Sequence, residues 1–414
     1  MPLGVPAVWL CLPHRRAFVS WYAQPVSCSV PEHSAVPPVP SAPLPATRAR
    51  IGAGSFAELT TFAVGGPFDR LVEASSEEEI VEAVRAADAE GRPLMMLGGG
   101  SNVLASDDYF DGVVVRDARQ DVVLVQEGGC EGANLRVTAG TPWDAFVVHT
   151  IEREWMGLEA LSGIPGTVGA APVQNIGAYG RDVAGSIARV HVYDRLAGRP
   201  DDLPAEALGF GYRTSLIKRS LLDWGPSPRY IVLSVDFQLR LASLSAPVQY
   251  GQLARLLGVQ PGGRVPSADL REAVLELRRS KGMVLDDTDR DTYSCGSFFT
   301  NPVLTEEQAA RLPEGAPRFG VADGSRAALG AAAPAARGQV KTSAAWLIDR
   351  AGFPAGYGMP GPAALSTKHC LAVTNRGGAS AAQLRALART VRGGVREAFD
   401  VTLEAEPVVI GEPL

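Results

Sequence analysis

Two glycine-rich segments constrain this chain more than any other feature, because consecutive glycines open backbone conformations that other residues avoid. The first is the run Gly98, Gly99, Gly100, Ser101 and Asn102, which directly follows a short apolar stretch typical of a buried strand. A sharp bend there leaves backbone N–H groups free to bind phosphate oxygens, and the Ser and Asn side chains add donors. A simple tight turn explains this run equally well when it is considered alone.

The second segment spans residues 163–180 and reads GIPGTVGAAPVQNIGAYG. Its small residues suit close contact with a flat cofactor, although a glycine-rich surface loop is the plainer alternative. It lacks the GxGxxG pattern, and no helix is predicted directly after it, so a Rossmann dinucleotide site is disfavoured. Two such segments in one chain favour a cofactor that carries a diphosphate.

Strand and helix patterns are mixed along the chain without strict βαβ alternation, which favours an α+β fold. Two helices are predicted to begin at capping boxes, Ser76 with Glu79 and Ser380 with Gln383. Further helices are predicted at 143–152 and 268–280, and strands at 94–97, 113–115, 122–125, 135–138, 187–193 and 230–239. A length of 414 residues predicts two or three domains.

Three stretches are predicted to lie outside this regular pattern or to end it. Residues 1–54, rich in Pro, Ser, Ala and Val between 30 and 45, are expected to form a flexible leader. Residues 315–338, rich in Ala, Gly and Pro, are expected to be a loop or an insertion. A strand from Val401 to Ile410 is expected to close the chain, with Glu404 and Glu406 on one face.

Composition disfavours several classes of function. A formal net charge of −6 argues against nucleic-acid binding, although local Arg and Lys residues can still bind an anionic substrate. The five cysteines and five histidines lack CxxC and HExxH spacing, which argues against a metal site and against a disulfide framework. The apolar runs are too short for a membrane span of about 20 residues. Near the N-terminus, the basic residues follow the apolar stretch, which is the wrong order for a signal peptide.

Three polar clusters are candidates for chemistry. Arg213, beside Tyr212 in a predicted turn, can clamp a carboxylate, while a surface Arg that covers apolar area is the plainer alternative. Ser297 precedes two aromatic residues and can be a positioned hydroxyl in a dry pocket, but it lacks the GxSxG context of a hydrolase nucleophile. Glu404 and Glu406 are by default surface charges.

Eight segments taken in order resemble the UDP-N-acetylenolpyruvoylglucosamine reductases, and they extend from about Leu59 to Gly411. The segments are LTTFAVGG, LGGGSNVL, GLEALSGIPGTVGAAPVQNIGAYG, GFGYRTS, CGSFFTNP, WLIDRAGF, STKHCLAVTN and LEAEPVVIG. The resemblance implies a two-part FAD-binding region at 55–240, of the PCMH or vanillyl-alcohol-oxidase type. It also implies a smaller α+β substrate-binding domain at 251–396 and a C-terminal strand at 397–414 that returns to the FAD-binding region.

The resemblance assigns roles to individual residues. Catalysis is implied for Arg213, Ser297 and Glu406. FAD contacts are implied for Gly98, Gly99, Gly100, Ser101, Asn102, Gly163, Ile164, Pro165, Gly166, Thr167, Gly169, Ala170, Asn175, Gly177, Ala178 and Tyr179. Substrate contacts are implied for Tyr212, Tyr250, Lys281, Asn301 and His369. The Tyr250 segment indicates the subclass with a mobile tyrosine loop, and no metal is implied.

The implied reaction is the NADPH-dependent reduction of UDP-N-acetylglucosamine enolpyruvate to UDP-N-acetylmuramate through bound FAD, a step of peptidoglycan precursor synthesis. The protein is expected to be a cytoplasmic monomer that binds neither nucleic acid nor membrane. Two alternatives are another FAD oxidoreductase that acts on an alcohol and a non-catalytic flavin-binding module. The segments at 296–302 and 403–407 argue against the first, and the joint presence of Arg213, Ser297 and Glu406 argues against the second.

The chain departs from the family pattern at two places. Family members commonly have Lys-Gly after WLIDRAGF, whereas this chain has Pro354-Ala355, so one expected phosphate-binding lysine is absent. The stretch from Lys281 to Ser297 is longer than the family minimum, which makes the match at Lys281 less direct.

Overall fold

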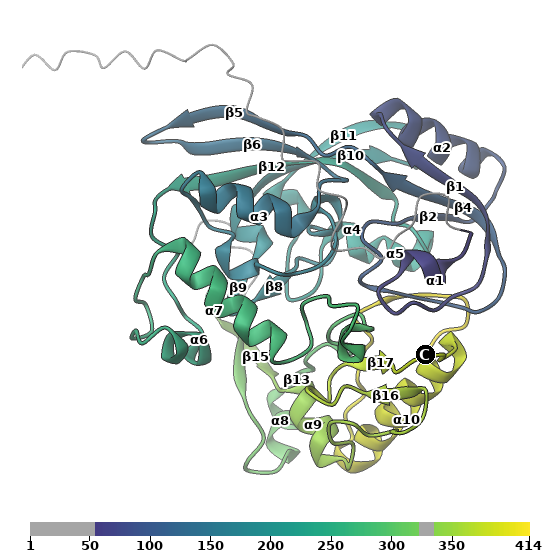
Figure 1. Cartoon of the computed structure of the whole chain (residues 1–414), viewed down its shortest axis with the longest axis vertical. Helices are drawn as coiled ribbons and strands as arrows, with labels where there is room; N and C mark the ends of the chain where they lie inside the picture. Colours follow the sequence, from purple (N-terminus) through teal and green to yellow (C-terminus); the bar gives the residue numbers. More distant parts are fainter. Residues whose placement is uncertain (1–53, 323–334) are drawn as a thin grey trace, which may run out of the picture. The chain divides into compact units, whose positions relative to one another are not determined.

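The computed structural model describes residues 54–322 and 335–414, so the predicted leader lies, apart from Gly54, outside the described residues. Within them, helices and sheets are mixed as the α+β prediction requires, and that prediction is confirmed. The elements form three groups along the chain (Figure 1).

The first group is a three-stranded parallel sheet in the order β1-β4-β2, covered by one helix. Its elements are α1 (Phe56–Leu59), β1 (Phe68–Ala74), α2 (Glu77–Ala89), β2 (Leu94–Met96), β3 (Val103–Ala105) and β4 (Phe110–Asp117). The apolar stripe of α2, with Ile80 and Val84 fully buried, packs on Val113 and Val115 of the central strand. Burial on both faces explains why β4 is a run of β-branched residues.

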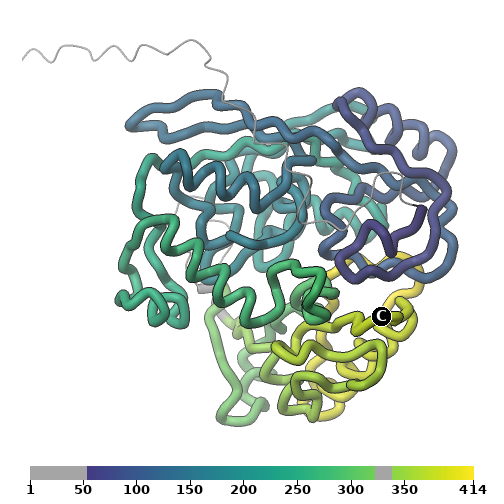
Figure 2. Tube along the Cα trace, in the orientation of Figure 1, coloured from purple at the N-terminus to yellow at the C-terminus, as the bar shows by residue number. Residues whose placement is uncertain are grey.

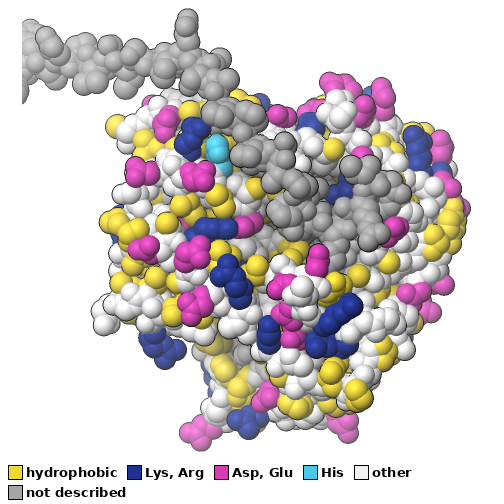
Figure 3. All heavy atoms as spheres, in the orientation of Figure 1, with side chains coloured by type: hydrophobic (Ala, Val, Ile, Leu, Met, Phe, Trp, Pro, Cys, Tyr) yellow, Lys and Arg dark blue, Asp and Glu magenta, His cyan; other side chains and the backbone are white. Residues whose placement is uncertain are grey.

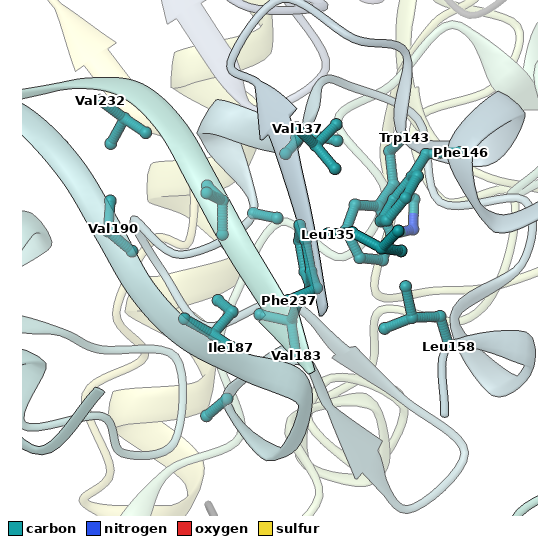
Figure 4. Packing of buried hydrophobic residues seen from close by; sticks show 14 of the residues in the cluster. Leu135, Val137, Trp143, Phe146, Leu158, Val183, Ile187, Val190, Val232 and Phe237 are labelled. Carbon is teal, nitrogen blue, oxygen red and sulfur yellow. The ribbon is translucent and has the colours of Figure 1, made fainter. Parts of the chain in front are cut away.

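The second group is a six-stranded sheet with the path β11-β10-β12-β6-β5, to which β7 adds at β12. Its strands are β5 (Val122–Gly128), β6 (Gly132–Thr138), β7 (Trp155–Met156), β10 (Ile187–Asp194), β11 (Arg199–Pro204) and β12 (Tyr230–Leu241). Helix α3 (Trp143–Glu152) lies across this sheet, and Figure 4 shows Trp143 and Phe146 packed beside Phe237. The ring centroids of Phe146 and Phe237 are 5.0 Å apart.

Short elements between α3 and β12 carry the second glycine-rich segment and the turn that follows it. They are η1 (Glu159–Leu161), η2 (Val168–Ala170), β8 (Gly177–Ala178), β9 (Arg181–Asp182), η3 (Val183–Ser186), η4 (Ala205–Leu208), α4 (Leu216–Arg219) and α5 (Leu221–Trp224). After β12 come α6 (Gly251–Leu256) and α7 (Ser267–Arg279), whose apolar residues share a core with Ala160 and Tyr179. These two helices therefore pack against the second group, and the domain boundary at residue 251 stays a prediction.

The third group combines small sheets with helices around a core that also includes Phe62, Val64 and Leu104 of the first group. Its elements are η5 (Arg290–Thr292), β13 (Val303–Thr305), α8 (Glu306–Arg311), β14 (Phe319–Ala322), β15 (Ala335–Lys341), α9 (Ala344–Arg350), β16 (Ala363–Leu365), β17 (Val373–Asn375) and α10 (Ala381–Phe399). The prediction of a loop at 315–338 is wrong at both ends, because β14 and β15 pair there. Small residues hid the strands from a pattern search, and residues 323–334 lie outside the described part.

The predicted C-terminal strand is wrong over most of its length. Only β18 (Val408–Ile410) is a strand, and it pairs in parallel with β3 of the first group. Figure 2 shows the yellow C-terminal trace returning alongside the purple N-terminal part. Because the chain between Val401 and Glu406 follows an irregular path, Glu404 is exposed while Glu406 is buried, and the two do not share a face.

The two helix starts that were predicted as capping boxes differ in their hydrogen bonds. At Ser380 both bonds of the capping box are present, so that prediction is confirmed. At Ser76 the hydroxyl accepts the N–H of Glu79 as predicted, while the Glu79 carboxylate accepts the N–H of Ser75 at 2.7 Å. The helix begins at the predicted place in both cases.

The described surface carries both signs of charge. On the face drawn in Figure 3, Lys and Arg side chains are interspersed with Asp and Glu side chains. Across residues 54–322 and 335–414, no helix is long and apolar enough to cross a membrane. The same residues include no group of three His, Cys, Asp or Glu side chains that could hold a metal ion. Cys130, Cys295 and Cys370 are free thiols, and the other two cysteines lie outside the described part.

Candidate active site

A cavity of about 530 Å³ is lined by residues from all three groups of elements. Its walls include the loop after β2, the second glycine-rich segment, the end of α7, the segment 294–301 and Glu406. All but four of the residues assigned to the site from the sequence line this cavity. The four that do not are Gly163, Gly166, Asn175 and Tyr212.

The loop Gly98–Asn102 presents unbonded backbone to the cavity. None of its five N–H groups donates to an acceptor within the described residues. At Gly100, where φ is +63°, a Cβ atom would lie 1.9 Å from the carbonyl oxygen of Leu59, so only glycine fits. Five consecutive free N–H groups around such a bend form a concave donor surface that suits a phosphate oxygen.

Gly163 and Gly166 shape the second glycine-rich segment instead of lining the cavity. The N–H of Gly163 donates to Asp144 at 2.6 Å, and the carbonyl of Gly166 accepts the N–H of Trp143 at 3.0 Å. Both have positive φ, +71° and +121°. They support the segment that holds Ile164, Pro165 and the other lining residues, and their contact with the cofactor stays a prediction.

Asn175 also serves the fold of the site. Its side-chain oxygen accepts the N–H of Ala184 at 3.1 Å, and its amide nitrogen donates to the carbonyl of Gly211 at 3.1 Å. Both polar ends are thus used inside the protein, and the residue is buried. It ties the second glycine-rich segment to the turn that carries Arg213, and its contact with the cofactor stays a prediction.

Arg213 lies in a tight turn and is held at a positive φ of +54°. One terminal nitrogen donates to the carbonyl of Gly177 at 2.8 Å, and the other reaches the carbonyl of Asn175 at 3.4 Å. The Nε atom is 3.1 Å from Oε1 of Glu406, an ion pair that is not aligned as a hydrogen bond. A planar guanidinium fixed from three sides cannot swing away from the cavity.

Backbone contacts next to Ser297 join its segment to the segment that carries Glu406. Phe298 and Phe299 are fully buried with their rings 5.0 Å apart. The N–H of Glu406 donates to the carbonyl of Phe298 at 2.9 Å, and Phe299 bridges to Ala405. The Ser297 hydroxyl lines the cavity and has no hydrogen-bond partner among the described residues, so it is free to donate to a ligand.

Tyr212 supports the wall without lining the cavity. Its hydroxyl accepts the N–H of Asn301 at 3.2 Å, and the ammonium of Lys341 lies 4.5 Å from its ring centroid. Asn301 lines the cavity, while its side-chain oxygen accepts the N–H of Ala344 at the start of α9. Tyr212 therefore positions Asn301, and its direct contact with the substrate stays a prediction.

Three further predicted residues lie at one end of the cavity. Tyr250 is 40% exposed and meets the ring of Tyr179 edge-on at 5.5 Å. Burial, and then the charge of Arg278, lower the pKa of the Lys281 ammonium. Burial, and then Lys281, lower the pKa of His369 to about 4, so its imidazole is neutral at pH 7.

Several lining residues were not assigned from the sequence. Arg278 is buried, its Nη2 atom donates to the carbonyl of Met283 at 2.8 Å, and its Nε atom has no partner among the described residues. Lys218 and Gln174 also line the cavity. Arg278 lies in the last turn of α7, three residues before Lys281, which follows the end of the helix. None of these three residues had a distinct signal in the sequence.

Two family models match the chain in separate regions. One, described as an FAD binding domain, matches residues 68–196. The other, described as UDP-N-acetylenolpyruvoylglucosamine reductase, C-terminal domain, matches residues 288–410. The cavity is lined from within both matched regions and from the residues between them.

Curated proteins and solved structures give the same picture. A UDP-N-acetylenolpyruvoylglucosamine reductase of Thermobifida fusca (strain YX) is 49% identical over 358 residues, which are 86% of this chain and 97% of that protein. One of Streptomyces coelicolor is 49% identical over 86% of this chain and 89% of its own length. The crystal structure of the reductase from Thermus caldophilus matches with a TM-score of 0.55 and 25% identity, over 86% of this chain and 97% of that chain.

Proposed function

The chain belongs to the UDP-N-acetylenolpyruvoylglucosamine reductase family, and from that premise we propose how its cavity performs the reaction. The protein is an FAD-dependent oxidoreductase that reduces UDP-N-acetylglucosamine enolpyruvate to UDP-N-acetylmuramate with NADPH, for peptidoglycan precursor synthesis. The single observation that carries the mechanism is the meeting of Arg213, Ser297 and Glu406 in one cavity with the free N–H groups of Gly98–Asn102.

The residues present fit FAD. The free N–H groups of the first glycine loop suit its diphosphate, and the small side chains of the second segment leave room for a flat ring. FAD, when bound, supplies a carrier that takes a hydride from NADPH and gives one to the substrate. We assign its contacts to those lining residues of both segments that the resemblance implies as FAD contacts, which do not include Gln174.

Reduction of the enolpyruvyl group adds a hydride to its methylene carbon and a proton to the adjacent carbon. Negative charge develops on the substrate carboxylate as the hydride arrives. We assign Arg213 to that carboxylate, because a fixed cation there stabilises the developing charge more than the ground state. We assign Ser297 as the donor of the proton, because its hydroxyl faces the cavity without a protein partner.

The uridine diphosphate end of the substrate has cations available to it. Lys281, Lys218 and Arg278 line the cavity, while Pro354, which replaces the family lysine, is exposed and outside the lining. We propose that Lys281 and Arg278 supply the charge that the absent lysine would give, with Asn301 and His369 as neutral partners, whereas Lys218 lies near Glu406. Tyr250 supports assignment to the tyrosine-loop subclass.

We further propose that NADPH and the sugar nucleotide use the cavity in turn, in a cytoplasmic monomer. Steady-state kinetics should then be ping-pong, with inhibition at high sugar nucleotide. The first test is the absorbance spectrum of the purified protein, which should show flavin bands and their bleaching by NADPH. Colourless protein that takes up no added FAD would overturn the proposal, and intersecting kinetic lines would overturn the shared cavity.

Replacing Tyr250 with Phe should raise KM for the sugar nucleotide several-fold and leave kcat within about twofold. The reason is that its exposed hydroxyl can add a hydrogen bond of about 1 kcal/mol to the bound nucleotide, distant from the reacting carbons. Tyr109→Phe is the matched control, since Tyr109 is 57% exposed and does not line the cavity. A large fall in kcat with unchanged KM would reassign Tyr250 to the transition state.

The pH dependence of KM should show no step near pH 6.5 from His369. With its pKa lowered to about 4 by burial, this imidazole stays neutral from about pH 5 upward and gains a proton only in more acidic solution. His369→Gln should nearly preserve KM, whereas His369→Ala should raise it about 5- to 15-fold through loss of one hydrogen bond. A step in KM near pH 6.5 that His369→Gln removes would show that a protonated imidazole binds the substrate.

The role of Glu406 can be decided by three substitutions. If protonated Glu406 donates a hydrogen bond to the developing charge, Glu406→Gln keeps a donor and should retain far more activity than Glu406→Ala or Glu406→Asp. If Glu406 acts as an ionised partner that holds Arg213, which lies 3.1 Å away, Gln should be as inactive as Ala. We expect the first result, measured as kcat with normal FAD content. Glu404→Gln is the matched control, because Glu404 is exposed.

A further inference from the structure

Three hydrogen bonds join Asn102, Gln174 and Glu406 in a closed ring at the edge of the cavity. The side-chain nitrogen of Asn102 donates to the backbone carbonyl of Glu406 at 3.2 Å and to Oε1 of Gln174 at 2.7 Å. The side-chain nitrogen of Gln174 donates to Oε1 of Glu406 at 3.3 Å. The ring therefore connects the first glycine loop, the second glycine-rich segment and the C-terminal segment.

The direction of these bonds is dictated by chemistry. A backbone carbonyl can only accept, so Asn102 must present its NH₂ group to Glu406. The same NH₂ group then requires the oxygen of Gln174, which leaves the NH₂ group of Gln174 to face the Glu406 carboxylate. Flipping either amide would set two oxygens or two NH₂ groups against each other. Asn102 thus fixes the orientation of Gln174.

The two oxygens of Glu406 are consequently unequal. Oε1 accepts from Gln174 and is 3.1 Å from Nε of Arg213. Oε2 has no hydrogen bond to any residue of 54–322 or 335–414, although the residue lines the cavity. When one oxygen of a carboxylate is bonded to the protein, its other oxygen is available to bind the ligand.

We propose that Gln174 is a positioning residue that holds Oε1 of Glu406, so that Oε2 alone faces the substrate and carries any proton that Glu406 exchanges. The proposal rests on the proposed function, because it concerns the same reaction. Gln174 acts through Glu406, so its loss should disturb the reduction of the substrate and leave the reaction with NADPH intact.

Other groups that face Glu406 set the background for a pH test. They are Arg213, Lys218 on α4, Tyr212 and the Cys295 thiol. Burial, and then the charge of Glu406, raises the pKa of the Cys295 thiol. None of these is altered by a change at residue 174. A second carboxylate placed there would face Oε1 directly, and two like charges so close retain a shared proton to higher pH.

The test compares two variants at residue 174. Gln174→Met removes the hydrogen-bond donor, whereas Gln174→Glu keeps the size of the side chain and replaces the NH₂ group that faces Glu406 with a carboxylate oxygen. Flavin reduction by NADPH and flavin reoxidation by the sugar nucleotide are measured separately in stopped flow. Both variants should reoxidise about 10- to 100-fold more slowly, as expected for a displaced catalytic group, with NADPH reduction within twofold of wild type. In Gln174→Glu, the acidic limb of the reoxidation profile should also move to higher pH.

Gln126→Met, on the exposed edge strand β5, is the matched control and should behave as wild type. In a Glu406→Gln background, Gln174→Met should cost little further rate, because the two residues act as a unit. Equal slowing at every pH in Gln174→Glu, or additive losses in the double variant, would overturn the proposal. If Gln174→Met fails to bind FAD, the proposal is tested with Gln174→Glu alone and with Gln174→Glu in the Glu406→Gln background. Wild-type protein that never reduces the sugar nucleotide would overturn the proposed function instead.

Discussion

Replacing Ser297 with Ala should reduce turnover by about 10²- to 10⁴-fold, the usual contribution of a positioned proton donor. The carbon next to the enolpyruvyl methylene group must gain a proton, and the Ser297 hydroxyl lines the cavity with no partner among the described residues. The loss should appear only in the reoxidation of flavin by the sugar nucleotide. FAD content and the rate of reduction by NADPH should stay normal, because neither needs this hydroxyl.

Two further variants, Ser297→Cys and Ser243→Ala, test the role of the Ser297 hydroxyl more closely. Ser297→Cys keeps a proton donor in nearly the same place and should recover part of the lost rate. Ser243→Ala removes a hydroxyl from an exposed position outside the cavity and should leave both half-reactions unchanged. Reoxidation near the wild-type rate in Ser297→Ala would mean that Ser297 is only structural and that another group supplies the proton.

Glycine-rich turns were easier to predict from the sequence than strands of small residues, and the difference has a physical cause. The glycine loop at 98–102 was readable because a bend with free N–H groups needs particular residues in a short window. The strands β14 and β15 were missed because their Ala and Gly residues carry little strand signal.

Some residues that were predicted to contact a ligand do not line the cavity, which shows a second limit of prediction from sequence. Asn175 and Tyr212 stand in segments that do form the site, yet their side chains bond to backbone behind the cavity wall. A linear pattern locates a segment, but it cannot say which side chains of a compact loop turn inward. The same limit applies to Gln174, whose contact with Glu406 joins residues 232 positions apart.

Arg213→Lys should lower kcat by about 10²- to 10³-fold, the cost of losing a fixed donor at a developing negative charge. The guanidinium is held by the carbonyls of Gly177 and Asn175 and by Glu406 at the same time. A lysine ammonium keeps the charge but has no planar fork, so it cannot make these contacts and face the substrate together. Lys must adopt the same φ of +54° as Arg, so no additional backbone strain is expected on folding.

A control variant and a double variant distinguish an electrostatic role of Arg213 from a merely structural one. Arg219→Lys changes an exposed arginine near the same turn that bonds the carbonyl of Gly209, and it should leave kcat unchanged. FAD content and reduction by NADPH should be normal in both variants. Because Arg213 and Glu406 act as a pair, Arg213→Lys combined with Glu406→Gln should lose less than the product of the single losses. Activity within threefold of wild type in Arg213→Lys would show that a mobile point charge suffices, and the clamped guanidinium would then have no catalytic role.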